Sequence, residues 1–253
     1  MISLRNKTKR KKIFLIFYVV FLLLLLAAGL LLSPLFKVKT VEVYGTKEIN
    51  PDEIKASIEY KNILFITGNG LKNELLKKFP QIAQLDIEKN IPKTTIKITL
   101  TERQKAGIIC KTEQGENGEE IVKSCFYVDK LGVIFKNAPQ TSGSLILLIK
   151  DFSLEDFSLG KKIFSEQIMN SIIELRDNIF SQINVRAMWF ANFTSPPEEI
   201  KVMTSEGWYA LFDLNRDIKS QLSILKAALA EKIKDRKKLE YIDLRIENRI
   251  YYK

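Results

Sequence analysis

An uncharged run of 20 residues, Ile13 to Leu32, is the feature that most constrains this chain. At about 1.5 Å rise per residue, a helix of this length would extend roughly 30 Å, the thickness of a bilayer's hydrocarbon core. The preceding tail, residues 1–12, carries six cations and no acidic residue, which is typical of the cytoplasmic flank of a membrane helix. The sequence therefore predicts a cytoplasmic tail over residues 1–12, one transmembrane helix over residues 13–32, and an extracytoplasmic remainder.

A cleaved signal peptide is the alternative interpretation of this run. The apolar core of a signal peptide would span about 7–15 residues and end at a small-residue cleavage site. Here the small residues Ala27, Ala28 and Gly29 lie inside the run, and three leucines still follow them. This order favours an uncleaved, single-pass type II anchor in the plasma membrane.

The composition excludes several functions. The net charge is +10, but six of these charges lie in residues 1–12, so the basic excess suits lipid headgroups better than nucleic acid. The chain has no histidine, which removes Ser-His-Asp and Cys-His catalytic arrangements and two-histidine zinc motifs. We expect a phospholipid bilayer as a partner, and no nucleic acid, cofactor or metal ion.

Two Ser-x-x-Lys pairs, Ser158 with Lys161 and Ser223 with Lys226, match the acylation pair of penicillin-binding enzymes. No Lys-Thr-Gly or Ser-Asp-Asn sequence accompanies them, although that chemistry uses both. We therefore expect that the chain is not an enzyme.

The only cysteines are Cys110 and Cys125. The residues between them include Gly115, Asn117 and Gly118, which favour a hairpin with the two sulfur atoms opposite each other. In an oxidising compartment a disulfide closing a loop of about 15 residues would contribute roughly 3 kcal/mol. The alternative is two unrelated buried thiols.

Residues 36–103 alternate between strand and helix patterns in the order β-α-α-β-β. The first helix has strong start signals, with Asn50 as its cap, Pro51 in its first turn and two acidic residues behind them. The predicted strands cover residues 38–44, 84–90 and 95–101, and the second predicted helix covers residues 71–79.

Four segments of this part resemble a POTRA domain, and more narrowly that of the bacterial cell-division family FtsQ/DivIB. They are Val41-Glu42-Val43-Tyr44-Gly45, Phe79-Pro80-Gln81-Ile82, Ile91-Pro92-Lys93-Thr94-Thr95-Ile96 and Glu102-Arg103. The family tends to have proline two residues after this last pair, where this chain has Lys105.

Residues 104–253 continue the resemblance and predict a mixed β domain with two helices, the first over about residues 165–177. The segment from Tyr127 to Phe135 has the Asp-x-x-Gly turn of the family between two strands, with Gly132 at the turn. The segment from Tyr241 to Ile246 is similar to the closing Tyr-Ile-Asp-Leu-Arg strand of the family. The whole chain is thus expected to be an α+β protein with a membrane helix, a POTRA domain and a C-terminal β domain.

The resemblance implies a non-enzymatic scaffold of the divisome, located at the division septum. Such a scaffold links early and late cell-division proteins and helps to control septal peptidoglycan synthesis. The implied partners are FtsB/DivIC-like and FtsL-like membrane coiled-coil division proteins. The alternatives are a membrane-anchored cell-wall hydrolase or transpeptidase, and a POTRA chaperone of outer-membrane protein insertion.

Two strands are candidate partner-binding edges. The resemblance implies partner binding at the C-terminal strand, where Arg249, Ile250, Tyr251 and Tyr252 combine a cation with aromatic area. The strand containing Val41 and Val43 is the candidate edge in the POTRA domain. The alternative for the two tyrosines is that they complete the core of the β domain.

Overall fold

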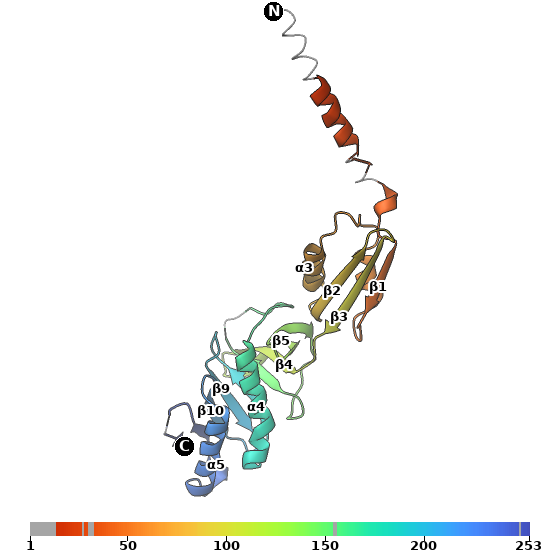
Figure 1. Ribbon diagram of the computed structural model, residues 1–253. Coiled ribbons are helices and arrows are strands. Elements are labelled where there is room, and N and C mark those ends of the chain that lie inside the picture. Colours follow the sequence, from red (N-terminus) through yellow and green to blue (C-terminus); the bar gives the residue numbers. More distant parts are fainter. Residues whose placement is uncertain (1–13, 27, 30–32, 154–155, 248) are drawn as a thin grey trace, which may run out of the picture. The chain divides into compact units, whose positions relative to one another are not determined.

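The computed structural model describes all of the chain except residues 1–13, 27, 30–32, 154–155 and 248 (Figure 1). The contacts divide the chain into two compact units, residues 1–102 and residues 103–253. Each unit has its own hydrophobic core.

The predicted transmembrane helix is wrong. In the part of the chain that the structure describes, no helix is long and apolar enough to cross a membrane. Residues 14–26 and 28–29 are helical. Residues 13, 27 and 30–32 of the predicted span, and the tail 1–12, lie outside the described residues. The single-pass topology and the plasma-membrane location, which rested on this helix, are corrected with it, and so is the septal location that the resemblance implied.

The first unit has the predicted order of strands and helices. Its elements are the 3₁₀ helix η1 (Pro34–Phe36), β1 (Thr40–Tyr44), α2 (Pro51–Ala56), α3 (Gly68–Lys78), β2 (Ile82–Asn90) and β3 (Thr95–Glu102). The sheet order is β1-β3-β2, with β1 parallel and β2 antiparallel to the central β3. Both helices begin at side-chain caps, because Asn50 accepts a hydrogen bond from the N–H of Asp52 and Thr67 accepts one from that of Gly70.

The carboxylate of Glu102 fastens the end of β3 to the loop before α2. It is buried and accepts hydrogen bonds from the backbone N–H groups of Lys47, Glu48 and Ile49, at 2.6, 3.0 and 3.0 Å. Burial raises the pKa of the Glu102 carboxyl, but the three N–H groups together outweigh it, so the pKa lies below its ordinary value of 4.5. The loop is thus held by a negative charge from a strand more than 50 residues away.

Replacing this carboxylate should weaken the first unit in a pH-dependent way. The substitution Glu102→Gln should lower the free energy of unfolding of the first unit by about 2 kcal/mol at neutral pH, because three N–H groups lose a charged acceptor. Since the folded-state pKa is depressed, the contribution is present above pH 4.5 and is lost as the pH falls through the lower folded-state pKa. Hydrogen exchange of residues 46–50, compared with wild type at each pH, measures the loss.

A matched control for this experiment is Glu88→Gln, because Glu88 pairs with Lys97 on the exposed surface of the same sheet. This substitution should lower the free energy of unfolding by less than about 0.5 kcal/mol. Equal losses in the two variants, or a Glu102→Gln effect that grows as the pH falls, would contradict the assignment.

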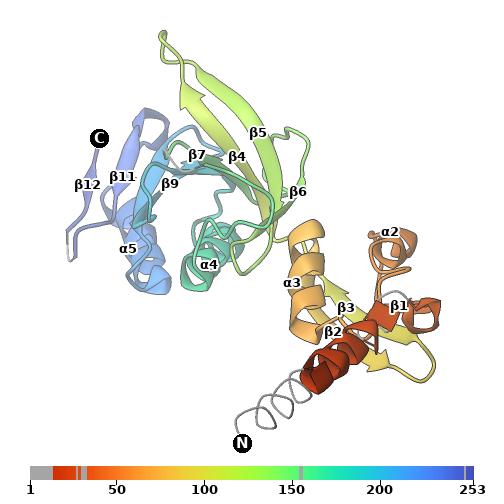
Figure 2. The same ribbon diagram turned by 90° about the horizontal axis from the view of Figure 1, so that it is seen from above.

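The second unit is built on one large sheet. Its strands are β4 (Gly107–Gln114), β5 (Glu120–Val128), β6 (Ile134–Asn137), β7 (Leu148–Asp151), β8 (Ala187–Asn192), β9 (Glu199–Thr204), β10 (Tyr209–Asp213), β11 (Tyr241–Asp243) and β12 (Tyr251–Tyr252). Their order is β12-β11-β10-β9-β8-β7-β4-β5-β6. The helices α4 (Glu166–Ile183) and α5 (Ile218–Glu231) lie on one face of this sheet, and the 3₁₀ helix η2 (Arg236–Lys238) precedes β11 (Figure 2).

The turn between β5 and β6 is held by the carboxylate of Asp129. One oxygen accepts the N–H groups of Leu131 and Val133, both at 2.9 Å, and the other pairs with Arg103 at 2.6 Å. Gly132 has a φ of +80° at this turn, and a Cβ atom there would lie 2.1 Å from the carbonyl oxygen of Phe164. The turn therefore requires glycine both for its backbone conformation and for space.

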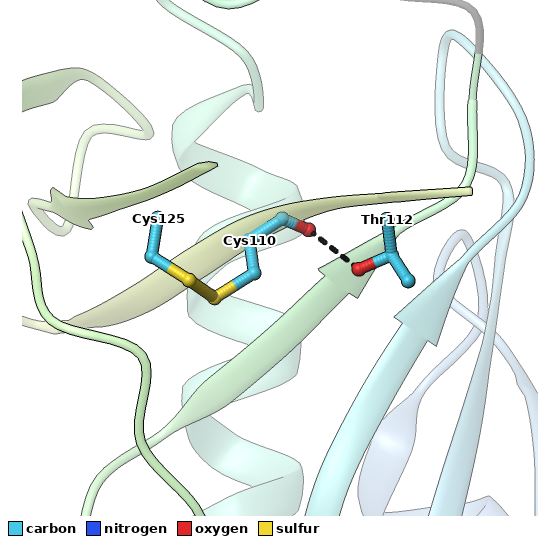
Figure 3. The surroundings of a disulfide bond; sticks show 3 residues. All are labelled: Cys110, Thr112 and Cys125. Atoms are coloured by element: carbon cyan, nitrogen blue, oxygen red, sulfur yellow. Dashed lines mark hydrogen bonds between the residues drawn. A yellow bond between two sulfur atoms is a disulfide. The ribbon is translucent and has the colours of Figure 1, made fainter. Parts of the chain in front are cut away.

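The two cysteines form a disulfide between neighbouring strands (Figure 3). Cys110 of β4 and Cys125 of β5 lie directly opposite each other in the antiparallel register. The hydroxyl of Thr112 donates a hydrogen bond to the carbonyl oxygen of Cys110 at 3.2 Å. The bridge thus joins the two arms of the β4–β5 hairpin.

Candidate partner-binding edge

The last strand of the chain forms one edge of the nine-stranded sheet. β12 pairs with β11 alone, antiparallel, with Tyr252 opposite Ile242 and Tyr251 opposite Asp243. Figure 2 shows β12 outside β11, next to the C-terminus. This edge strand is the C-terminal strand that the sequence analysis gives as a candidate partner-binding edge.

The backbone of β12 presents hydrogen-bonding groups on this open side. Lys253 exchanges both backbone hydrogen bonds with Tyr241, at 3.2 and 3.3 Å. Bonded and non-bonded residue pairs alternate along an antiparallel ladder, so the N–H and C=O of Tyr252 point away from β11. An extended segment of another protein can therefore add to the sheet along this side.

The side chains of the edge divide between surface and core. Tyr251 is 47% exposed and Tyr252 is 50% exposed, so neither ring completes the hydrophobic core. Ile250 is partly buried and packs against the core cluster of this unit, whereas Arg249 is exposed. Ile250 therefore anchors the strand, while the two tyrosines and Arg249 remain accessible to a partner.

A charged network holds β11 in place beside this edge. Arg245 pairs with Asp243 at 2.6 Å and also with Glu199 of β9. The hydrogen bond from Arg245 lowers the pKa of Asp243 below its ordinary value, although burial opposes the shift. Arg216 adds hydrogen bonds to the carbonyl oxygens of residues 244 and 245. The contacts to Glu199 and Arg216 join segments far apart in the sequence, so local patterns could not indicate them.

Aromatic and cationic side chains line the sheet next to the edge. The rings of Tyr209 and Tyr241 stack with their centroids 5.5 Å apart, and the ammonium of Lys201 lies 4.0 Å from the Tyr209 ring centroid. At the end of β12, Lys253 pairs with Glu240 at 2.9 Å. Sequence reasoning missed this group because its members come from four separate segments.

The structure offers little support for a metal site or for the Ser-x-x-Lys pair of Ser223 with Lys226. Among the described residues, no group of three or more acidic, histidine or cysteine side chains could hold a metal ion. Ser223 is exposed on α5, and its hydroxyl donates to the carbonyl oxygen of Lys219 within the same helix. The residues that remain candidates for binding a partner are those of the sheet edge.

The other candidate residues lie in the first unit. Val41 is buried and Val43 is partly buried against its core, so their side chains serve packing. Their strand β1 nevertheless forms an edge of the sheet order β1-β3-β2. A three-stranded sheet with a parallel edge strand and two helices, in the order β-α-α-β-β, is thus complete within residues 36–103.

Residues 36–103 match the POTRA domain of FtsQ type. The match confirms the resemblance found in the first unit and indicates a cell-division protein. No curated protein matches the chain.

A partner that bound along β1 would contact the backbone of the POTRA domain rather than the predicted side chains. Because Val41 and Val43 pack inward, a partner added along β1 would contact main-chain groups and the exposed Glu42 and Tyr44. Tyr44 is 51% exposed and donates a hydrogen bond to Glu42 at 3.2 Å. These two exposed side chains of the POTRA edge were not among the residues predicted from the sequence.

Proposed function

We propose that this chain is an FtsQ/DivIB-like, non-enzymatic scaffold of the bacterial divisome. It binds FtsB/DivIC-like and FtsL-like coiled-coil division proteins and thereby links early and late cell-division proteins. Through these partners it helps to control septal peptidoglycan synthesis.

One observation carries this proposal. A POTRA domain of FtsQ type is followed, in the same chain, by a sheet whose last strand is an open edge with two half-exposed tyrosines. The resemblance of residues 104–253 to the FtsQ/DivIB family assigns partner binding to this strand. The geometry of β12 suits that role independently of the resemblance.

Binding proceeds by strand addition. A segment of the FtsB/DivIC-like partner extends the sheet beyond β12 and bonds to the free N–H and C=O of Tyr252. Tyr251 and Tyr252 supply large rigid contact area at low cost in conformational entropy, and Arg249 offers a bidentate contact to a carboxylate. The POTRA edge at β1 is a second surface of the same kind for another division protein.

Amide hydrogen exchange tests the proposal on the full chain. Saturating FtsB/DivIC-like partner should slow exchange in residues 249–253 by at least about 10-fold, because outward amides become hydrogen-bonded. Residues 166–183 of α4, on the helical face, serve as the internal reference and should not change. Protection confined to other parts of the sheet, or none at saturation, would reject β12 as the docking strand.

A further inference from the structure

A pocket of about 380 Å³ lies on the sheet face opposite α4 and α5. A small second apolar cluster lies on this face. Its members alternate along the strands with residues that point into the main core, and they are Ile108, Cys110, Cys125 and Leu148. The pocket spans four neighbouring strands, β5, β4, β7 and β8, and the loop 140–143 forms its remaining wall. Its volume falls at the lower end of the roughly 300–1,000 Å³ typical of small-molecule sites.

The floor of the pocket is apolar and rigid. Val122 of β5, Leu148 of β7 and Trp189 of β8 line it, together with one of the bridged cysteines, Cys110. Because the disulfide joins β4 to β5 directly opposite each other, the wall on that side is fixed covalently. Sites on paired strands hold their geometry better than sites on loops.

One ion pair stands at the side of this floor. Lys150 pairs with Glu120, and its ammonium also lies 4.0 Å from the centroid of the Trp189 ring. The Lys150 side chain is only 16% exposed, whereas Glu120 is 37% exposed. The cation is therefore held against the apolar floor, while its carboxylate partner faces solvent and is the more readily exchanged of the two.

We propose that this pocket binds the carboxyl terminus of a peptide whose last residue is apolar. The terminal carboxylate takes the place of Glu120 on Lys150, and the last side chain packs against Leu148, Val122 and Trp189. The loop 140–143, with Gln140, Thr141 and Ser142, offers amide and hydroxyl groups to the preceding peptide unit. This site is separated from β12 by β9, β10 and β11 in the sheet, so it does not depend on the proposed divisome role.

N-acetyl-leucine is the simplest probe of this chemistry, and Trp189 reports on it. The chain has two tryptophans, and the other, Trp208, is fully buried in the main core. Adding N-acetyl-leucine should change the fluorescence of Trp189 with a Kd of about 1 mM, as expected for a ligand of this size. Trp189→Phe should abolish the response and so identify its source.

Two comparisons isolate the carboxylate contact. N-acetyl-leucinamide, which lacks the carboxylate, should bind at least about 10-fold more weakly than N-acetyl-leucine. The substitution Lys150→Gln should weaken the binding of N-acetyl-leucine by a similar factor. The matched control is Lys201→Gln, because Lys201 also lies 4.0 Å from an aromatic ring but outside the pocket. That control should bind like wild type.

Three results with N-acetyl-leucine and its amide would each contradict the proposal. These are no Trp189 response up to about ten times the expected Kd, equal affinity for the acid and the amide, or unchanged affinity in Lys150→Gln. Free leucine tests the source of the carboxylate, because it carries an ammonium where a peptide continues. Tighter binding of free leucine than of N-acetyl-leucine would identify the ligand as a free amino acid rather than a peptide terminus and would overturn the proposal.

Discussion

Deleting residues 249–253 should weaken binding of the FtsB/DivIC-like partner at least about 100-fold. The deletion removes the outward backbone groups of Tyr252 and two half-exposed aromatic rings, each worth roughly 2 kcal/mol if it is central to the interface. Calorimetric titration of the full chain and of the deletion variant with purified partner measures the change in Kd.

Single substitutions separate docking from folding in this experiment. Tyr252→Pro removes one outward N–H, and proline is tolerated on an edge strand when its missing N–H faces solvent. Its matched control is Phe180→Ala on α4, since Phe180 is 48% exposed and lies off the edge. We expect weaker binding in the first variant and wild-type binding in the second. If the deletion variant binds with unchanged Kd while Trp208 fluorescence reports a folded core, the assignment of β12 as the docking strand is wrong.

Gly132→Ala should destabilise the second unit by about 3 kcal/mol or more. The residue has a φ of +80°, and its Cβ atom would lie 2.1 Å from the carbonyl oxygen of Phe164, a backbone atom that cannot turn aside. Relieving this clash requires the β5–β6 turn to move away from the segment leading into α4. Urea unfolding followed by Trp208 fluorescence measures the loss.

The sequence supplies a close control for this substitution. Gly118 has a φ of +76° in the β4–β5 hairpin, but a Cβ atom there would meet nothing within 4 Å. Gly118→Ala should therefore cost only the strain of a positive φ, about 1 kcal/mol. Equal losses in the two variants would show that backbone conformation alone, and not the contact with Phe164, makes Gly132 necessary.

Local sequence patterns predicted most of the helix starts and turns, because these are determined by residues adjacent in the sequence. Asn50 and Pro51 marked the start of α2, and Gly132 marked the turn between β5 and β6. The helix expected over residues 165–177 continues to Ile183, where Asn184 ends it in a left-handed conformation with a φ of 56°. Asparagine at a helix end was the available indication of that longer helix.

Features that depend on distant residues were not predictable in this way. The strand β7 is missing from the sequence analysis, because its two apolar residues, Leu148 and Ile149, are adjacent and do not alternate with polar ones. The hydrogen bonds between Glu102 and the loop at Lys47, and the contact of Arg245 with Glu199, join residues about 50 positions apart. The pocket beside Trp189 likewise needs four strands to be in place. The candidate edge at β12 was predictable because the resemblance to the FtsQ/DivIB family implies partner binding at the C-terminal strand.

The disulfide determines what a protease would leave behind. Residues 115–120 at the tip of the β4–β5 hairpin are mostly exposed, so this tip is the natural place for a cut. Cys110 and Cys125 lie on opposite sides of any cut made there. The two fragments would remain one covalent molecule, migrating as a full-length chain in a gel without reductant and separating only when a reductant is added.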